Sequence, residues 1–253
     1  MLAAERKLRI VEYVRQSRIA TVAALAKEFH VHEATIRRDL MDIEQEGLLK
    51  RTHGGVIAEQ WTYDEPPFHE RSNTRLEQKM QIGKLAASLV EDGEHIIIDS
   101  GTTTLHIAKN LVNRSNLTVV TNDINIAAEL KDAPGVRVIL TGGELYPSSY
   151  MLNGMFTNQV LGSLHVEKAF LGIPAIHPKH GLMHPEAQLV PAKQGMIQAA
   201  SEIIVVADDS KIGKISLHTV APNSAIHTLI TSKDVPEEEL KPFRDYGMTV
   251  YTV

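Results

Sequence analysis

The chain has 253 residues, enough for two average domains or one large one, and its 43% hydrophobic and 23% charged residues exclude a disordered or fibrous protein. It contains no cysteine, which excludes disulfides, thiolate metal sites and a cysteine nucleophile. Residues 1–9 lack the apolar stretch of a signal peptide, and no apolar run approaches the roughly 18 residues that span a bilayer. We therefore expect a cytoplasmic protein with no membrane partner.

The formal net charge of −5 is unevenly distributed, because residues 1–58 carry +2 and residues 59–253 carry −7. A bulk charge this small does not establish DNA binding, since affinity for phosphate depends on where the cations lie. The placement of individual lysines and arginines therefore has to decide between function classes.

The first 58 residues predict three short helices and a β-hairpin. Apolar residues recur at helical spacing in residues 4–16 and again in residues 22–29, where Thr21 is suited to cap the helix. A turn at residues 30–32 follows. Two helices joined by about three residues are typical of a helix-turn-helix.

The third helix is marked by Ile36, Leu40 and Ile43 on its buried side, and we expect it to end at Gly47. Residues 48–58 then show a strand, a glycine turn and a second strand, which together predict a small wing.

Burial of that apolar side turns the cations near the start of the third helix outward. This end enters the major groove in helix-turn-helix docking, where guanidinium groups bond guanine or phosphate. The wing cations would meet the flanking backbone, and its glycines would permit close approach. The alternative is a solvated helical face beside an ordinary hairpin. The predicted DNA-binding residues are Thr35, Arg37, Arg38, Lys50, Arg51, His53, Gly54 and Gly55.

Residues 33–40 (EATIRRDL), then Gly47-Leu48 and residues 51–55 (RTHGG), closely resemble the N-terminal module of the DeoR family of bacterial transcriptional regulators. Members are mostly repressors of sugar-catabolic operons, so the resemblance implies that the chain reads double-stranded operator DNA. One departure is His32, where the family usually has a serine or threonine suited to capping the recognition helix.

The helical pattern breaks between residues 59 and 78, where Pro66-Pro67 stands in a polar segment. We interpret residues 59–78 as a semi-rigid linker, with a further helix starting near Leu76. This divides the chain into a DNA-binding domain at 1–58, the linker, and an effector-sensing and oligomerisation domain at 79–253.

Beyond the linker, short β-rich runs alternate with helical stretches. Continuous apolar strands between helices predict a parallel sheet covered on both faces, and hence an α/β fold. The strands are expected at residues 96–98, 117–120, 136–140, 169–171, 203–206 and 228–230, and helices at 104–111, 124–130 and 188–200.

Ligands of open α/β sheets bind beyond the carboxyl ends of the strands. Small, polar or charged residues follow four predicted strands, at 99–104, 121–123, 141–143 and 208–213. The first of these leads into a helix, whose free amides, with hydroxyls and a glycine, suit an anion. Taken singly, segments such as Thr121-Asn122 and Gly142-Gly143 favour ordinary strand-to-helix turns, and Lys193 favours a surface position on its helix.

The same segments resemble the C-terminal effector domain of the DeoR family, which has the fold of ribose-5-phosphate isomerase and senses a phosphorylated sugar. By this resemblance, residues 100–103 would cradle the phosphate, while Asp99, Asn122, Lys193 and Lys211 would face the sugar. Pro174 and Pro191 depart from the family and would reshape the ligand wall. The expected effector-binding residues are Asp99, Ser100, Gly101, Thr102, Thr103, Thr121, Asn122, Gly142, Gly143, Lys193, Asp209 and Lys211.

Three clustered histidines, His177, His180 and His184, do not follow a recognised metal-ligand spacing, so we interpret them as exposed loop residues and expect no metal. Phosphate-loop, dinucleotide and hydrolase motifs are absent from the sequence. We therefore expect no cofactor and no catalytic residue.

These observations predict a repressor of a carbohydrate-catabolic operon that a phosphorylated sugar releases from DNA, acting as a homo-oligomer, either a dimer or a tetramer. Two alternatives stay open. One is a sugar-phosphate isomerase-like enzyme with an appended DNA-binding module, for which Asp99, Asp208 and Glu186 are candidate bases. The other is a C-terminal half that only mediates oligomerisation.

Overall fold

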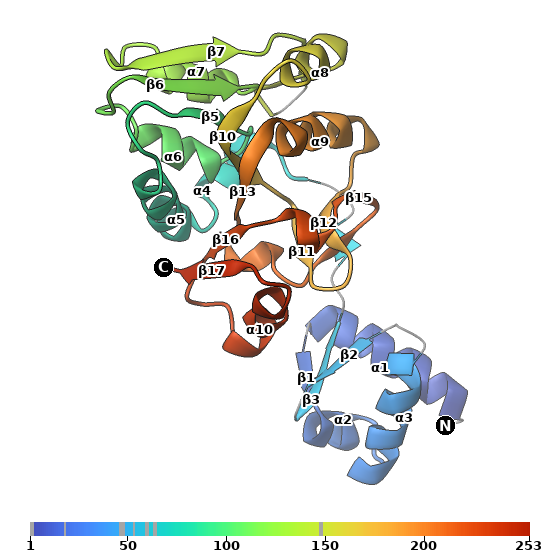
Figure 1. Cartoon of the computed structure of the whole chain (residues 1–253). Coiled ribbons are helices and arrows are strands. Elements are labelled where there is room, and N and C mark those ends of the chain that lie inside the picture. Colours follow the sequence, from blue (N-terminus) through green and yellow to red (C-terminus); the bar gives the residue numbers. More distant parts are fainter. Residues whose placement is uncertain are drawn as a thin grey trace. The chain divides into compact units, whose positions relative to one another are not determined.

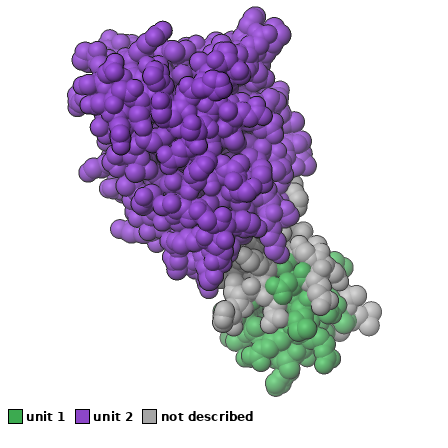
Figure 2. Space-filling view, in the orientation of Figure 1, with its two compact units in different colours: residues 1–61 green, residues 62–253 purple. Residues whose placement is uncertain are grey.

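The computed structural model describes residues 3–17, 19–45, 49–52, 54–58, 61–62, 65–146 and 149–253. The chain divides into two compact units, residues 1–61 and residues 62–253, coloured separately in Figure 2. Strand β4 (Trp61–Thr62) lies at the division.

The first unit combines three helices with a small antiparallel sheet. The helices are α1 (Ala3–Ser17), α2 (Val22–Glu28) and α3 (Glu33–Gln45). Strands β1 (Ile19–Thr21), β2 (Leu49–Thr52) and β3 (Gly55–Ala58) pair in the order β1-β3-β2. The predicted helices and wing hairpin are confirmed. Strand β1 was not predicted, because three residues between two helices are too few to show an alternating pattern.

The core of the first unit is built from the apolar stripes of its helices. Ile10, Val14, Leu25 and Ile36 are fully buried there. Thr21 caps α2 as predicted, since its hydroxyl accepts a hydrogen bond of 3.1 Å from the Ala24 amide. The predicted end of the third helix, Gly47, lies outside the described residues.

The second unit is built on a seven-stranded sheet in the order β17-β16-β13-β10-β5-β6-β7, and its registered pairings are all parallel. Its strands are β5 (His95–Ile98), β6 (Leu117–Thr121), β7 (Val136–Leu140), β10 (Val166–Gly172), β13 (Ala200–Val206), β16 (Thr228–Thr231) and β17 (Thr249–Thr252). All six predicted runs are strands of this sheet. Strand β17 (TVYT) was not predicted, because it is a largely exposed edge strand that contains two threonines and no continuous apolar run.

Successive residues of β5 point to opposite faces of the sheet. Ile96 and Ile98 belong to one hydrophobic core and Ile97 to the other, so both faces are covered, as predicted. Figure 1 shows α5 and α6 on one face and α9 on the other. The helices contributing to the first core are α5 (Leu76–Ser88), α6 (Thr104–Lys109) and α7 (Ile124–Leu130), and those contributing to the second are α8 (Met155–Leu161), α9 (Val190–Ala199) and α10 (Glu237–Asp245).

The segment interpreted as a linker, residues 59–78, contains helical structure. Helix α4 (Phe68–Asn73) lies within it, and α5 begins at Leu76, as predicted. Pro67 is the N-cap residue of α4. A proline lacks a backbone N–H, and this costs nothing at the start of a helix, where the first amides have no partner in the helix. The Pro-Pro pair therefore directly precedes helix α4. A polar composition is compatible both with a linker and with a short exposed helix, so it did not distinguish between them.

Smaller antiparallel elements lie around the main sheet. Strands β8 (Glu144–Tyr146) and β9 (Met151–Asn153) form a hairpin, with Glu144 opposite Asn153. A second small sheet contains β11 (Ala175–His177), β12 (Gly181–His184) and β15 (His218–Ala221). The remaining elements are β14 (Ile215–Ser216) and the 3-10 helices η1 (Ala187–Leu189), η2 (Asp209–Lys211) and η3 (Asn223–Ala225).

Candidate functional site

Helix α3 of the first unit presents its cations to solvent. Its apolar stripe is buried, with Ile36 at 0% exposure and Leu40 at 1%, so the residues between them turn away from the core. Arg37 and Arg38 are exposed and Thr35 is half-buried, as the helical periodicity predicted. This geometry leaves two guanidinium groups near the N-terminal end of α3, where a recognition helix contacts base edges.

The two arginines differ in their surroundings. Arg37 donates a 2.8 Å hydrogen bond to Glu33, four residues earlier on the exposed helix surface. Arg38 has no hydrogen-bond or ion-pair partner among the described residues. Asp39, the next residue, is buried and accepts hydrogen bonds of 2.6 and 3.1 Å from Arg6 of α1. This bidentate pair fixes the position of α3 against α1 and leaves Arg38 available for a ligand.

The wing places its predicted residues unequally. The backbone of Lys50 and Arg51 belongs to β2, but their side chains lie outside the described part of the chain, as does His53. Gly54 faces open space, whereas a Cβ on Gly55 would lie 2.2 Å from the Ala20 carbonyl oxygen of β1. Strand packing alone therefore requires glycine at position 55, and its role in letting DNA approach stays a prediction.

In the second unit, the loop after β5 offers unused donors. Thr102 and Thr103 are 5% and 8% exposed. Within the described part of the chain, the amides of Gly101, Thr102 and Thr103 and the two threonine hydroxyls make no hydrogen bond. Ser100 is already engaged, because its hydroxyl donates to Asp123 at 2.6 Å. The donors that remain for an anion are thus those of residues 101–103.

Asn122 and Asp123 connect this loop to the end of β6. Asn122 accepts a hydrogen bond from the Ser100 amide (3.1 Å) and donates one to the Leu152 carbonyl of β9 (3.1 Å). Asp123 caps α7 by accepting from the Asn125 amide at 2.7 Å, and Thr121 accepts from the Asp123 amide at 3.1 Å. Burial raises the pKa of Asp123, partly offset by the Ser100 hydrogen bond. Asp123 lies in the predicted polar segment 121–123 but was not among the expected effector-binding residues, although an aspartate directly before a helical run is an N-cap signal.

Asp99 and Lys193 form a buried ion pair. The Lys193 ammonium donates to one Asp99 carboxylate oxygen, Oδ2, at 2.5 Å and to the Gly172 carbonyl at 2.8 Å. The Gly172 amide also donates to Asp99 Oδ2, at 3.1 Å. Burial raises the pKa of Asp99, and the nearby charge of Lys193 opposes that shift.

Each member of the pair has hydrogen-bonding capacity that the described residues do not use. Asp99 Oδ1 is buried and has no hydrogen-bond partner among the described residues. An ammonium has three N–H groups, of which Lys193 uses two. The structure therefore joins two predicted residues that are far apart in sequence, and it leaves one acceptor and one donor on them.

The glycines after β7 shape the connection to the β8–β9 hairpin. Gly142 and Gly143 have φ angles of +72° and +123°, which favour glycine. A Cβ on Gly143 would lie 2.4 Å from the Asn153 carbonyl oxygen, so this position needs glycine for backbone approach as well. The Gly142 carbonyl accepts a 2.6 Å hydrogen bond from Thr157. These contacts explain both glycines by local structure.

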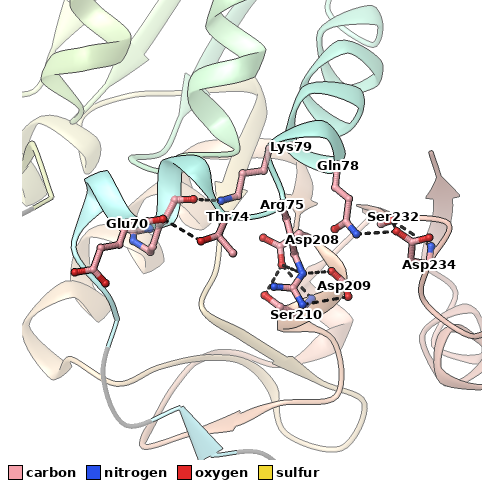
Figure 3. Close-up of polar contacts among 11 residues, drawn as sticks. Glu70, Thr74, Arg75, Gln78, Lys79, Asp208, Asp209, Ser210, Ser232 and Asp234 are labelled. Atoms are coloured by element: carbon pink, nitrogen blue, oxygen red, sulfur yellow. Dashed lines mark hydrogen bonds and ion pairs between the residues drawn. The ribbon is translucent and has the colours of Figure 1, made fainter.

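Asp209 and Lys211, the remaining predicted residues, follow β13. In the sheet, β10 separates β13 from β5, the strand that precedes the predicted phosphate loop. Figure 3 shows the Arg75 guanidinium directed at Asp208 and Asp209, and Arg75 Nε contacts Asp209 Oδ1. Arg75 adopts a left-handed backbone conformation (φ 55°) just before α5. No local sequence pattern predicts the role of Arg75, because its partner Asp209 lies 134 residues away in the chain.

Lys79 of α5 lies beside the same cluster. It is 3% exposed and donates to the Arg71 carbonyl, and burial lowers its pKa to about 8 against the opposing charge of Asp208. Lys211 lies close enough to add to the lowering. The structure thus groups Asp209 and Lys211 with Arg75 and Lys79, two basic residues that were not predicted from the sequence.

The interpretation of the three histidines was wrong for two of them. His177 and His184 are 2% and 1% exposed, and only His180 is exposed. The two buried residues end β11 and β12, so their Pro- and Gly-containing segment is a packed hairpin and not a solvated loop. His184 Nε2 lies 3.7 Å from Glu65, which also pairs with Arg71 at 2.7 Å.

Pro191 is exposed in the first turn of α9, a position that suits proline, and Pro174 is buried between β10 and β11. The described residues contain no group of three or more His, Asp or Glu side chains that could hold a metal ion. Among the same residues, no helix has the length and apolar character needed to cross a bilayer.

Comparisons with known proteins cover both units. Residues 6–61 match the DeoR-like helix-turn-helix domain, and residues 74–233 match the DeoR C terminal sensor domain. The chain is 36% identical to the HTH-type transcriptional repressor GlcR of Bacillus subtilis, over 92% of this chain and 90% of GlcR. It is 31% identical to the HTH-type transcriptional regulator GolR of Listeria innocua, over 99% and 98%. Ribose 5-phosphate isomerase A from Methanocaldococcus jannaschii superposes on 55% of this chain and 55% of its own, at 18% identity and a TM-score of 0.41.

A winged helix-turn-helix followed by an α/β sensor unit defines a DNA-binding transcriptional regulator that responds to a small molecule. The chain belongs to the DeoR family of such regulators. The similar proteins are named as regulators of transcription, so the isomerase-like enzyme considered above is not favoured.

Proposed function

We propose that the chain is a repressor of a carbohydrate operon that leaves its operator when a phosphorylated sugar binds the second unit. The main evidence for DNA binding is that Arg37 and Arg38 are exposed on helix α3, whose apolar side is buried. The name of the relative GlcR, a transcriptional repressor, supports the direction of control.

The effector half rests on the loop after β5 and on the Asp99–Lys193 pair. Free amides and hydroxyls at residues 101–103 suit the oxygens of a phosphate, which accept hydrogen bonds. Asp99 Oδ1 and the third N–H of Lys193 suit sugar hydroxyls, which both donate and accept. A phosphorylated sugar carries both kinds of group in one small molecule, so it fits this arrangement better than inorganic phosphate alone does.

Release of DNA requires that the effector bind one conformational state more tightly than the other. Recognition helices of a two-fold dimer sit about 34 Å apart to read successive major grooves. Binding of the sugar phosphate in the second unit would alter this spacing between two copies. We therefore propose a homo-oligomer, a dimer or a tetramer, that acts in the cytoplasm.

Titration of labelled promoter DNA with the full chain tests the proposal. We expect a specific shift that Arg38→Ala weakens by roughly 10- to 100-fold, the loss of one bidentate contact, and that a phosphorylated sugar reverses. Lys131→Ala removes an exposed cation of the second unit and serves as the control. The proposal fails if no promoter fragment is bound specifically, or if Arg38→Ala binds as the wild type does.

A further inference from the structure

A polar hollow of about 540 Å³ lies on the second unit, at the hairpin of β8 and β9. It is lined by Glu144, Leu145, Tyr146, Asn153, Gly154 and Gln188. Pockets for small molecules have volumes of roughly 300–1,000 Å³ and combine apolar surface with a few well-placed polar groups. This hollow has a suitable size, and four of the six described residues that line it have polar side chains.

The walls of the hollow are attached to the proposed effector loop on two sides. Strand β9 contains Asn153 and Leu152, and the Leu152 carbonyl accepts a hydrogen bond from the Asn122 side chain. The same side chain accepts a hydrogen bond from the Ser100 amide. On the other side, Gln188 precedes α9, the helix that carries Lys193 to Asp99. The hollow thus belongs to the same carboxyl edge of the sheet as the predicted phosphate loop.

The lining side chains already form a partial hydrogen-bond network. Gln188 donates from Nε2 to the Tyr146 hydroxyl at 3.0 Å, and Asn153 donates to the Gln188 carbonyl at 2.9 Å. Asn153 Oδ1 is buried and has no partner among the described residues. The Glu144 carboxylate has none in that part of the chain either. The exposed Glu144 carboxylate can therefore accept a hydrogen bond from a ligand in the hollow without breaking a contact among the described residues.

The charge of the hollow indicates which end of the proposed sugar phosphate it can bind, the phosphate or the hydroxyl groups. Among the described residues that line the hollow, none is cationic and Glu144 is an acid, so this lining disfavours a phosphate dianion. Carboxylate, amide and phenol groups instead bond neutral hydroxyl groups. We infer that this hollow binds the hydroxyl-bearing end of the phosphorylated sugar and that Glu144, Tyr146 and Asn153 determine which sugar is recognised.

This inference rests on the proposed function, and one experiment separates the two. Melting temperatures and affinities of the full chain are measured with inorganic phosphate, ribose 5-phosphate, glucose 6-phosphate, fructose 6-phosphate and glucitol 6-phosphate. Wild type is compared with Glu144→Gln and Tyr146→Phe. Glu144 has an exposed side chain without a described partner, so its substitution leaves the fold intact.

We expect each substitution to weaken the preferred sugar phosphate roughly tenfold, the effect of one lost hydrogen bond, and to change the ranking of the panel. The response to inorganic phosphate should not change. Glu129→Gln and Tyr246→Phe, at exposed positions away from the hollow, serve as matched controls and should keep the wild-type ranking. An unchanged ranking in both hollow variants, with wild type responding to the panel, overturns the subsite alone. A wild type that responds to no sugar phosphate overturns the proposed effector and the subsite with it.

Discussion

Asp99 and Lys193 show how an ion pair can serve a binding site at little net gain in stability. Both side chains are almost fully buried, and burial of two charges costs about as much as their attraction returns. The pair nevertheless holds Asp99 Oδ1 in place without a partner. In the proposed effector site, the pair would supply a positioned acceptor next to the donors of residues 101–103.

His184 is a buried base whose protonation opposes folding. Its Nδ1 accepts a 3.0 Å hydrogen bond from the Glu186 amide, so the ring proton of the neutral form lies on Nε2, toward Glu65. Burial lowers the pKa of His184 to about 3, and the cations of Lys193 and Arg71 act in the same direction. The unfolded chain binds this proton near pH 6.5, whereas the folded chain does not until about pH 3.

The free energy of unfolding should accordingly fall as the pH falls from 6.5 toward 3. At pH 5 the contribution of His184 amounts to about 2 kcal/mol. We expect His184→Gln to reduce the difference between urea unfolding at pH 7 and at pH 5 by this amount, while the exposed His165→Gln leaves it unchanged. The same pH dependence in wild type and His184→Gln would contradict the assignment.

At the scale of elements, the wing depends on the approach of β3 to β1. The two strands pair at Thr21 and Gly55, where a Cβ on Gly55 would meet the Ala20 oxygen at 2.2 Å and the Thr21 Cα at 2.9 Å. The neighbouring Gly54 has nothing within 4 Å of the corresponding position. Backbone atoms cannot move aside as a flexible side chain can, so only one of these glycines constrains the fold.

This difference gives a matched pair of substitutions. Gly55→Ala should destabilise the first unit by about 1–3 kcal/mol through overpacking and weaken operator binding, whereas Gly54→Ala should preserve its stability. Calorimetric unfolding of the full chain, followed by operator titration, measures both effects. Equal unfolding temperatures for the two variants would show that β1 does not constrain the wing.

At the scale of the whole molecule, the chain has a separate hydrophobic core in each unit. The first unit has its own buried cluster, and the second has large clusters on both faces of its sheet. A unit with its own core is able to fold alone. We therefore expect that separate fragments can bind the proposed effector and DNA.

A fragment of residues 62–253 should therefore fold, keep the melting-temperature response to any sugar phosphate that releases the full chain from DNA, and lose operator binding. At a ligand concentration of 100 times Kd, the stabilisation amounts to about 2.7 kcal/mol. Thermal unfolding with light scattering measures the response and the oligomeric state together. A fragment that assembles but responds to no such sugar would favour the interpretation that the second unit only mediates oligomerisation.

Local patterns in the sequence were enough to predict the three N-terminal helices, the Thr21 cap, the outward turn of Arg37 and Arg38, and six parallel strands. Each of these depends on residues within one or two turns of one another or within one apolar run. The loop after β5 was also predictable, because a strand followed by small polar residues and a helix is a local signal.

Contacts between distant segments decided the rest. The partner of Asp99 lies 94 residues away, the strands β1 and β17 are defined by their neighbours, and His184 is buried by packing that its Pro- and Gly-containing context does not indicate. The hollow beside the β8–β9 hairpin brings Gln188 to Tyr146 across 42 residues. Periodicity describes which side of an element is buried, whereas the partner that buries it depends on the three-dimensional path of the chain.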